Sequence, residues 1–148
     1  IVMKIEKTIK VIKDINPNTL IMVRIGSFYH AYGKDAYILS YLFNYQIKSI
    51  ENSYNTCGFP TSASNKVLKM LEDKKINYMQ ISRSENYEVE SEYNFKSDNT
   101  YEESYEKAYK YILKQNKINA IYSYLIDNIN KEDIKEKIKK IEEILYDC

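Results

Sequence analysis

Few residues in this 148-residue chain have side chains suited to catalysis. The chain has one histidine, His30, and two cysteines, Cys57 and Cys148, which lie far apart in the sequence. A nucleophile–histidine pair would therefore have to include His30, and no residue near it in sequence supplies an oriented partner. The two cysteines lack the spacing of a zinc site and are interpreted as reduced thiols.

The acidic residues and the glycines also argue against an enzyme. The paired carboxylates Glu102-Glu103 and Glu142-Glu143 are adjacent on predicted helices, so they point to different sides, as solvated residues do. The three glycines do not form the Gly-rich loop of a P-loop or dinucleotide-binding protein. We therefore expect a non-catalytic protein without a cofactor or metal. A small nuclease with scattered acidic metal ligands is a less favoured alternative.

The segment of residues 20–36 is the most informative part of the chain. Its Gly26-Ser27 pair suits a two-residue type II′ turn between a strand at 20–25 and a return strand that begins at Phe28. Alternation along the return strand places Phe28 and His30 on one face. Taken alone, Phe28 would more often be a core residue than a ligand-binding one.

The elements around this segment predict a mixed α/β sheet flanked by helices. Apolar spacing predicts helices over residues 3–15 and 35–43. A third helix is predicted to begin at a cap at Thr61, Ser62 or Ser64 and to reach residue 71. Strands are predicted over residues 20–25, 28–32, 45–50 and 77–82. Residues 51–56 are interpreted as a turn and Cys57-Gly58-Phe59-Pro60 as a break. Residues 85–97 are interpreted as an edge strand. The order β-β-α-β-α-β over residues 20–83 is typical of an α/β unit.

The last third of the chain is rich in helix formers. Three helical patterns cover residues 101–113, 118–129 and 134–145, and Asn130 is the predicted cap of the third. We therefore expect an α/β domain over residues 3–97 and a helical extension over residues 98–148. The Tyr-rich helices are predicted to be packing surfaces, for a partner or for a second copy, and not a stacking platform.

The composition describes a globular, cytoplasmic protein. Hydrophobic residues make up 44% and charged residues 29%, no run approaches the length of a membrane span, and the N-terminal residues alternate lysine with apolar side chains, unlike a secretory signal. The net charge is only +1, so a nucleic-acid surface would require local clustering of the 22 basic residues. No membrane partner is expected.

Two motifs in register resemble the N-terminal mismatch-recognition domain of MutS. In that family a strand ends in Arg-Met-Gly-Asp and is followed by Phe-Tyr-Glu, and here the sequence is Arg24-Ile25-Gly26-Ser27-Phe28-Tyr29-His30. The family's loop Ala-Gly-Ile/Val-Pro-Tyr-His-Ala is similar to Cys57-Gly58-Phe59-Pro60-Thr61-Ser62-Ala63. Residues 67–81 are similar to the helix and strand that follow this loop. The order and spacing agree over about half of the chain.

The resemblance implies that Phe28 wedges into a duplex from the minor groove and stacks on an unpaired or mispaired base. His30 stands where the family has the glutamate that hydrogen-bonds this base. The residues expected to contact nucleic acid are Phe28, His30, Ser27, Arg24, Lys34 and Lys66. The expected partner is distorted duplex DNA or an RNA–DNA hybrid.

The chain departs from the family pattern at important positions. His30 replaces a carboxylate, which only accepts hydrogen bonds, with a ring that can donate, accept, stack or carry charge, so mismatch discrimination does not carry over. Ser27 and the Thr61-Ser62 pair also change the neighbouring surface. The sequence has no counterpart of the clamp, lever or ATPase domains of MutS, and we expect no repair signalling from it.

Two functional hypotheses follow. The leading one is a non-catalytic nucleic-acid-binding accessory protein, because stand-alone proteins resembling this domain occur beside the reverse transcriptases of diversity-generating retroelements. That context implies a polymerase partner and an RNA or hybrid ligand. The alternative is a protein-interaction adaptor that docks a polymerase through the Tyr-rich helices without binding nucleic acid itself. The sequence leaves the stoichiometry open.

Overall fold

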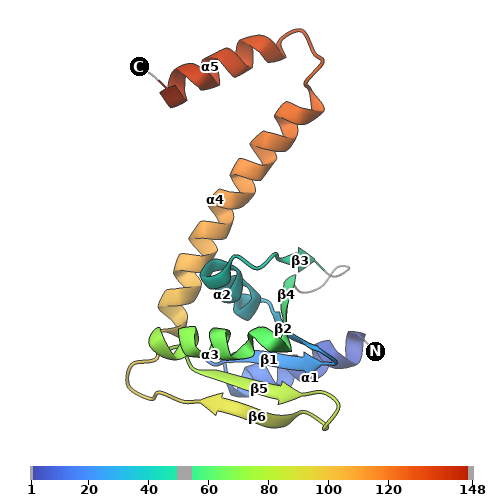
Figure 1. The fold of residues 1–148 in the computed structure, drawn as a ribbon, viewed down its shortest axis with the longest axis vertical. Helices are drawn as coiled ribbons and strands as arrows, with labels where there is room; N and C mark the ends of the chain where they lie inside the picture. Colours follow the sequence, from blue (N-terminus) through green and yellow to red (C-terminus); the bar gives the residue numbers. More distant parts are fainter. Residues whose placement is uncertain (1, 50–54, 147–148) are drawn as a thin grey trace. The chain divides into compact units, whose positions relative to one another are not determined.

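The structure is a computed structural model that describes residues 2–49 and 55–146 (Figure 1). In chain order its elements are α1 (Val2–Ile15), β1 (Leu20–Ile25), β2 (Phe28–Tyr32), α2 (Lys34–Phe43), β3 (Lys48–Ser49), β4 (Asn55–Pro60), a 3-10 turn (Thr61–Ala63), α3 (Ser64–Asp73), β5 (Tyr78–Ser82), β6 (Glu88–Tyr93), α4 (Tyr101–Asp127) and α5 (Ile134–Tyr146). They form two compact units, Ile1–Tyr111 and Ile112–Cys148.

The first unit is built on one six-stranded sheet with the order β3-β4-β2-β1-β5-β6. Strands β1 and β5 are parallel, and every other neighbouring pair is antiparallel. Gly26 in the β1–β2 turn has a φ of 62°, as the first position of a type II′ turn requires. The predicted mixed sheet flanked by helices, followed by further helices at the C-terminus, is therefore confirmed.

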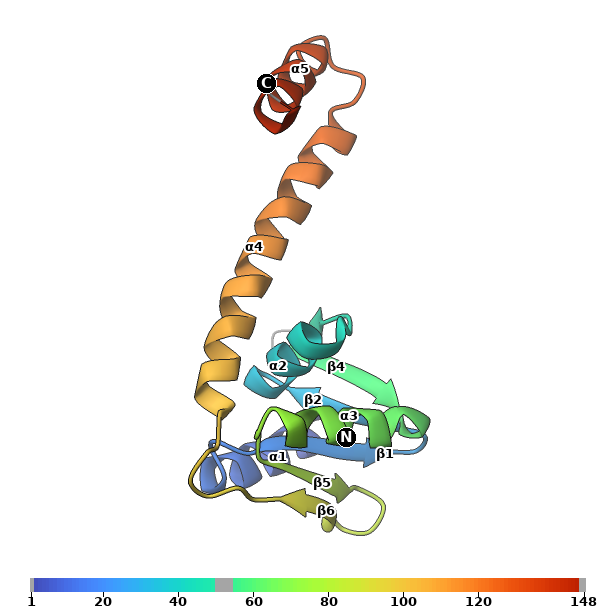
Figure 2. The same ribbon diagram turned by 60° about the vertical axis from the view of Figure 1, so that its left-hand side comes forward.

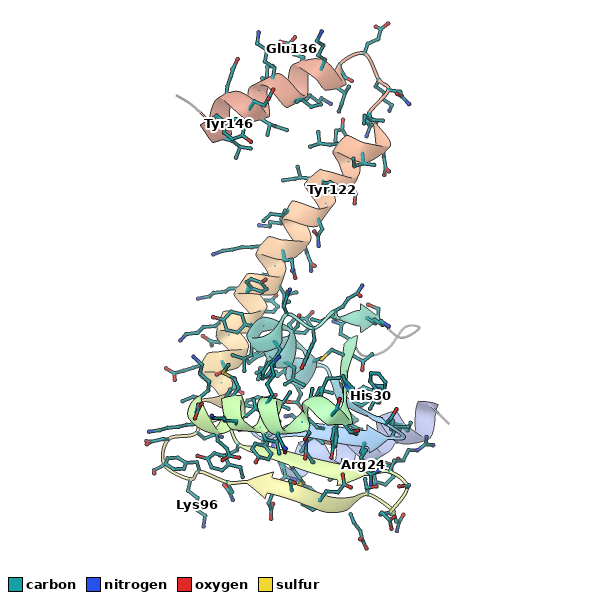
Figure 3. The ribbon with its side chains drawn as sticks, viewed as in Figure 1. Arg24, His30, Lys96, Tyr122, Glu136 and Tyr146 are labelled. Carbon is teal, nitrogen blue, oxygen red and sulfur yellow. The ribbon has the colours of Figure 1, made fainter. Side chains whose placement is uncertain are left out.

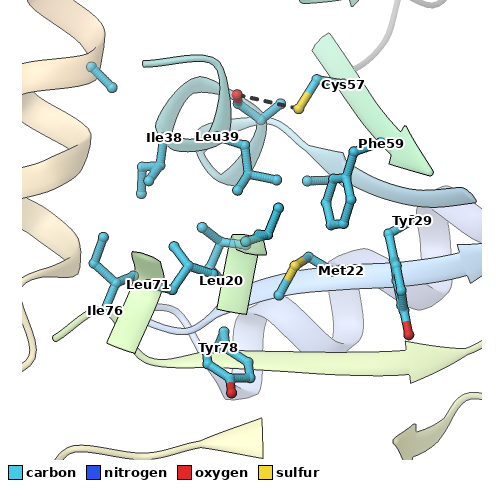
Figure 4. Close-up of a cluster of buried hydrophobic side chains, with 14 of the residues drawn as sticks. Leu20, Met22, Tyr29, Ile38, Leu39, Cys57, Phe59, Leu71, Ile76 and Tyr78 are labelled. Atoms are coloured by element: carbon cyan, nitrogen blue, oxygen red, sulfur yellow. Dashed lines mark hydrogen bonds between the residues drawn. The ribbon is translucent and has the colours of Figure 1, made fainter. Parts of the chain in front are cut away.

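Helices cover both faces of the sheet, and they can be followed in Figure 2. On one face, Leu20, Met22 and Phe59 pack with residues of α2, α3 and the first turns of α4 (Figure 4). On the other face, Ile21 and Val23 pack against α1. The first four residues of β1, Leu20–Val23, are buried on both faces of the sheet, which explains why all four are apolar.

Residues 57–60, predicted to be a break, belong to strand β4. Cys57 and Phe59 are buried and alternate with Gly58 and Pro60, so the segment has the period of a strand despite its glycine and proline. Pro60 is the last residue of β4, a position where its missing N–H does not interrupt the strand.

The strand predicted over residues 45–50 is only partly present, because β3 is limited to Lys48–Ser49 and residue 50 lies outside the described residues. Tyr45 instead stacks between Phe43 and Phe59, with ring centroids 5.4 and 5.7 Å away, and so covers the core. Within the predicted turn at 51–56, residues 51–54 lie outside the described residues, and Asn55 begins β4.

The first two C-terminal patterns form a single helix, α4, because the Lys114–Lys117 segment between them contains no glycine or proline. The third pattern is α5, which begins at Ile134. Its first helical hydrogen bond runs from the Lys137 N–H to the Asp133 carbonyl at 3.2 Å, so Asp133 occupies the cap position that was predicted for Asn130.

The two compact units divide later in the chain than the boundary predicted from composition at 97/98. Tyr101 and Ala108 of α4 are fully buried in the core of the sheet domain, so the first turns of this helix belong to the first unit. Within the described residues, each helix is too short or too polar to cross a lipid bilayer.

Candidate nucleic-acid interface

Phe28 has a fixed backbone and an exposed side chain. It is the first residue of β2, where its backbone lies between Ile25 of β1 and Pro60 of β4 in a three-stranded register. Its side chain is nevertheless 45% exposed. A planar apolar ring held at the end of a hairpin can contact a flat ligand without ordering a flexible loop.

His30 lies beside Phe28 on the same face of β2, as the strand alternation predicted. The two ring centroids are 6.3 Å apart and the planes are tilted by 36° (Figure 3 labels His30). Burial lowers the pKa of the half-buried His30, so the ring is neutral at pH 7. A neutral imidazole has one donor and one acceptor nitrogen, whereas a carboxylate only accepts.

Gly58 makes room for this histidine. It pairs directly with His30 across the β2–β4 ladder, and a Cβ atom at Gly58 would lie 3.2 Å from His30 Nδ1 and 3.2 Å from the Tyr29 carbonyl oxygen. Both contacts are tighter than an ordinary van der Waals contact. Gly58, from the second motif, therefore leaves room for His30, from the first motif. The sequence alone did not show this relationship.

Arg24 does not join Phe28 and His30. It pairs with Tyr29 across β1 and β2, so its side chain lies on the opposite face of the sheet. Arg24 Nε and Nη2 donate to Glu90 Oε2 at 2.9 and 2.7 Å, and Nη2 also donates to Ser82 Oγ at 2.9 Å (Figure 3 labels Arg24). This pairing with Arg24 lowers the pKa of Glu90. The guanidinium is thus held by β5 and β6.

The other predicted contact residues are distributed along the domain. Ser27 is exposed in the turn, and its carbonyl accepts the Thr61 N–H at 2.9 Å, which ties the hairpin to the segment before α3. Lys66 is exposed in the first turn of α3. Lys34 lies beyond the other end of β2, with Nζ 3.9 Å from Glu102 Oε1 and 4.8 Å from the centre of the Tyr105 ring. Ser27 therefore directly precedes Phe28 at the hairpin, whereas Arg24 and Lys34 are separated from Phe28 and His30. Lys66 lies on α3, which packs on the opposite face of the sheet from these two rings.

A buried polar cluster, unnoticed in the sequence, joins the elements behind the hairpin. Asp35, fully buried in the first turn of α2, accepts hydrogen bonds from Lys13 Nζ at 2.7 Å, Tyr101 Oη at 2.5 Å and the Ile21 N–H at 3.0 Å. Burial lowers the pKa of Lys13, and the negative charge of Asp35 opposes this change. The cluster connects α1, β1, α2 and α4. Its members lie far apart in the sequence, so local spacing gave no signal for it.

Lys10, Lys13 and Lys34 also line a cavity of about 250 Å³ between α1 and the end of β2. Lys10 Nζ lies 3.4 Å from Asp14 Oδ2, and Lys13 and Lys34 have the acidic partners given above. The cavity is therefore not a concentrated positive site. Among the described residues, no group of three or more His, Cys, Asp or Glu side chains is placed to hold a metal ion.

Together the fold and the hairpin define an α/β domain in which a mixed six-stranded sheet presents an exposed aromatic side chain at the start of β2. The family model of MutS domain I matches residues 4–117, and the chain belongs to this family. Domain I is the DNA mismatch-recognition domain of MutS, so the resemblance seen in the two motifs is confirmed at the level of the family. The matched region includes the first part of α4. No curated protein gave a significant match.

Proposed function

We propose that this chain is a non-catalytic nucleic-acid-binding protein that engages distorted duplex DNA or RNA–DNA hybrid by inserting Phe28 between bases. The observation that carries the proposal is the 45% exposure of a phenylalanine whose backbone is fixed between two neighbouring strands. Membership of the MutS domain I family supports the same ligand class.

The energetics favour distorted sites over regular duplex. Stacking of an aromatic side chain on a base contributes on the order of 1–3 kcal/mol. Unstacking an intact base step costs a few kcal/mol, and less at a mismatch, a bulge or an unpaired base. Insertion of Phe28 would therefore lower the free energy of binding only at sites where unstacking costs little.

His30 gives this wedge a different neighbour from the family's carboxylate. Because burial lowers the pKa of His30, the ring is neutral at pH 7 and can donate one hydrogen bond to a base acceptor. It also lacks the negative charge that would repel a nearby phosphate. We infer that this protein binds many kinds of distorted base and discriminates among them less than a family member with the carboxylate does.

Phosphate contacts contribute modestly in this proposal. Arg24 is engaged by Glu90, and Lys34 lies near Glu102. Of the predicted basic contacts, only Lys66 has no acidic partner among the described residues. Each phosphate neutralised by a basic residue changes the slope of log K against log salt by about 0.9. The affinity of the proposed interface should therefore depend weakly on salt.

We propose further that a polymerase, specifically the reverse transcriptase of a diversity-generating retroelement, is the protein partner. The support is the resemblance to MutS-like proteins found beside such enzymes and the neutral His30, which suits a hybrid ligand as well as DNA. The proposal includes a cytoplasmic location. Co-purification of the chain with such a reverse transcriptase, and preference for hybrid over DNA duplex, would support it; absence of both would contradict it.

The binding proposal is tested with matched, mismatched and bulged DNA duplexes and an RNA–DNA hybrid, at fixed salt, by fluorescence anisotropy. The wild type should prefer the mismatched or bulged ligands, and Phe28→Ala should lose about tenfold in affinity for them. Tyr109→Ala is the matched control, because Tyr109 is 44% exposed in the same unit. Negligible binding by wild type and Phe28→Ala alike would favour the adaptor function instead.

A further inference from the structure

The second unit, defined by the later part of α4 and by α5, exposes an unusual amount of apolar side chain. Ile118, Ile121 and Tyr122 of α4 and Ile144, Leu145 and Tyr146 of α5 are each between 58 and 80% exposed (Figure 3 labels Tyr122 and Tyr146). Scattered exposed apolar residues are ordinary, but a concentration of them on two successive helices marks a binding surface. We call this set the apolar surface of the second unit.

Helix α5 leaves much of the apolar side of α4 exposed. Ile118, Ile121, Tyr122, Leu125 and Ile126 recur with the spacing of one helix face, and all but Leu125 are 47–65% exposed. Helix α5 has an apolar stripe of its own, Ile134, Ile138, Ile141 and Leu145, spaced by four, three and four residues.

The groove between the two helices is also apolar and open. It has a volume of about 440 Å³ and is lined by Ala120, Ile121, Tyr124 and Leu125 of α4 and by Lys137, Lys140 and Ile141 of α5. Of the α5 stripe, Ile134 is buried, whereas Ile138 is 41% and Leu145 66% exposed. The α4–α5 pair therefore leaves much of its apolar surface exposed.

The area is sufficient for a stable association. Six side chains of this size, each more than half exposed, present on the order of 700 Å² of apolar surface. A typical specific interface buries about 800 Å² on each partner. The largest apolar patch on an ordinary monomer is about 300–600 Å².

The charges on α5 indicate which partner fits. Residues 134–140 contain four lysines and one glutamate, and residues 141–146 contain two glutamates and no lysine. In an antiparallel pair of α5 helices, Lys139 and Lys140 of one copy face the half that carries Glu142 and Glu143 of the other. A parallel pair would place like charges together. A surface complementary to itself in this way is the requirement for a two-fold symmetric dimer.

We propose that the second unit is a dimerisation element whose apolar surface binds the same surface of a second copy of this chain, with the two α5 helices antiparallel. The dimer carries two Phe28 hairpins, and a nucleic acid long enough to reach both would bind more tightly than to one. Dimerisation itself does not depend on the proposed nucleic-acid binding.

The test is sedimentation equilibrium of the full chain at concentrations from about 1 to 100 µM, a range that brackets typical dissociation constants. The wild type should be a monomer–dimer system. Ile144→Glu, at a position that is 80% exposed, should raise the dissociation constant about tenfold or more. The control is Val89→Glu on β6, where the exposure is 51% and no change is expected. Circular dichroism checks that both variants keep their helix content.

A charge exchange tests the antiparallel arrangement. Lys139→Glu with Lys140→Glu, and separately Glu142→Lys with Glu143→Lys, should each weaken self-association. A mixture of these two double variants should form heterodimers, and the quadruple variant should dimerise about as well as the wild type, because complementarity is restored. A wild-type monomer at 100 µM, a trimer or larger species, or a quadruple variant weaker than both doubles would overturn the proposal.

Discussion

The rings of Phe28 and His30 lie 6.3 Å apart on the same face of β2, and Gly58 faces the histidine from β4. The two motifs that identify the family in the sequence thus meet in one place, because β2 and β4 are neighbouring antiparallel strands. The neighbouring strands β1 and β4 hold the backbone of the exposed phenylalanine. The lack of a side chain at Gly58 leaves room for the histidine ring.

The pH dependence of stability should report on His30. Burial lowers the pKa of this side chain, so the unfolded chain takes up the proton first as the pH falls through about 6.5. The free energy of unfolding should therefore decrease between pH 7.5 and 5.5, and His30→Asn should remove part of that slope. Urea denaturation at three pH values measures it. Identical slopes for both proteins would refute the expectation, since the chain has no other histidine.

Gly58→Ala and Gly26→Ala should both destabilise the domain by about 1 kcal/mol, for different reasons. At Gly58 the new Cβ would press on His30 Nδ1, whereas at Gly26 the strain comes from the positive φ and nothing lies within 4 Å. Only Gly58→Ala should shift the imidazole resonances of His30 in an NMR spectrum. An unshifted His30 in Gly58→Ala would contradict the proposed contact.

The Lys13–Asp35–Tyr101 cluster should be essential for folding. Asp35→Asn leaves the Lys13 ammonium without its counter-ion and should cost about 3–5 kcal/mol, and Tyr101→Phe should cost about 1–2 kcal/mol. Asp98→Asn is the control, because the Lys75–Asp98 pair is half exposed and should contribute less than about 1 kcal/mol. Urea titration compares the three variants. A loss for Asp35→Asn as small as that for Asp98→Asn would show that the cluster is not stabilising.

The basic residues should separate into two classes when nucleic-acid binding is measured at several salt concentrations. Lys66→Ala should reduce the slope of log K against log salt by about 0.9, the value for one lost phosphate contact. Arg24→Ala should leave the slope unchanged, because its guanidinium is held by Glu90 and Ser82 on the opposite face from Phe28. A reduced slope for Arg24→Ala would mean that the Arg24–Glu90 pair opens when nucleic acid binds.

Most of the fold could be predicted from local patterns, and the errors have specific causes. The β1–β2 hairpin was predictable because Gly26-Ser27 has the residue types that its turn requires. Strand β4 was missed because Gly58 and Pro60 are ordinarily breakers, whereas here one accommodates His30 and the other ends the strand. The strand expected at Tyr45 failed because a tertiary contact, the stack on Phe59, determines its conformation.

The candidate site was less predictable than the fold. Alternation placed Phe28 and His30 together. Arg24 is close to them in the sequence but lies on the other face of the sheet, because an offset of one residue along a strand reverses the face. The pairing of Arg24 with Glu90 joins residues from β1 and β6, and the Asp35 cluster joins residues from α1, α2 and α4. Such long-range pairs leave no signal in local spacing.

The most direct test of the wedge uses a duplex with a single 2-aminopurine at an unpaired position, whose fluorescence reports its stacking. We predict that the wild type and the control Tyr109→Ala change this fluorescence on binding, and that Phe28→Ala does not, even at concentrations that saturate the duplex. The same fluorescence change with Phe28→Ala would contradict the account, because some other side chain would then be stacking on the base.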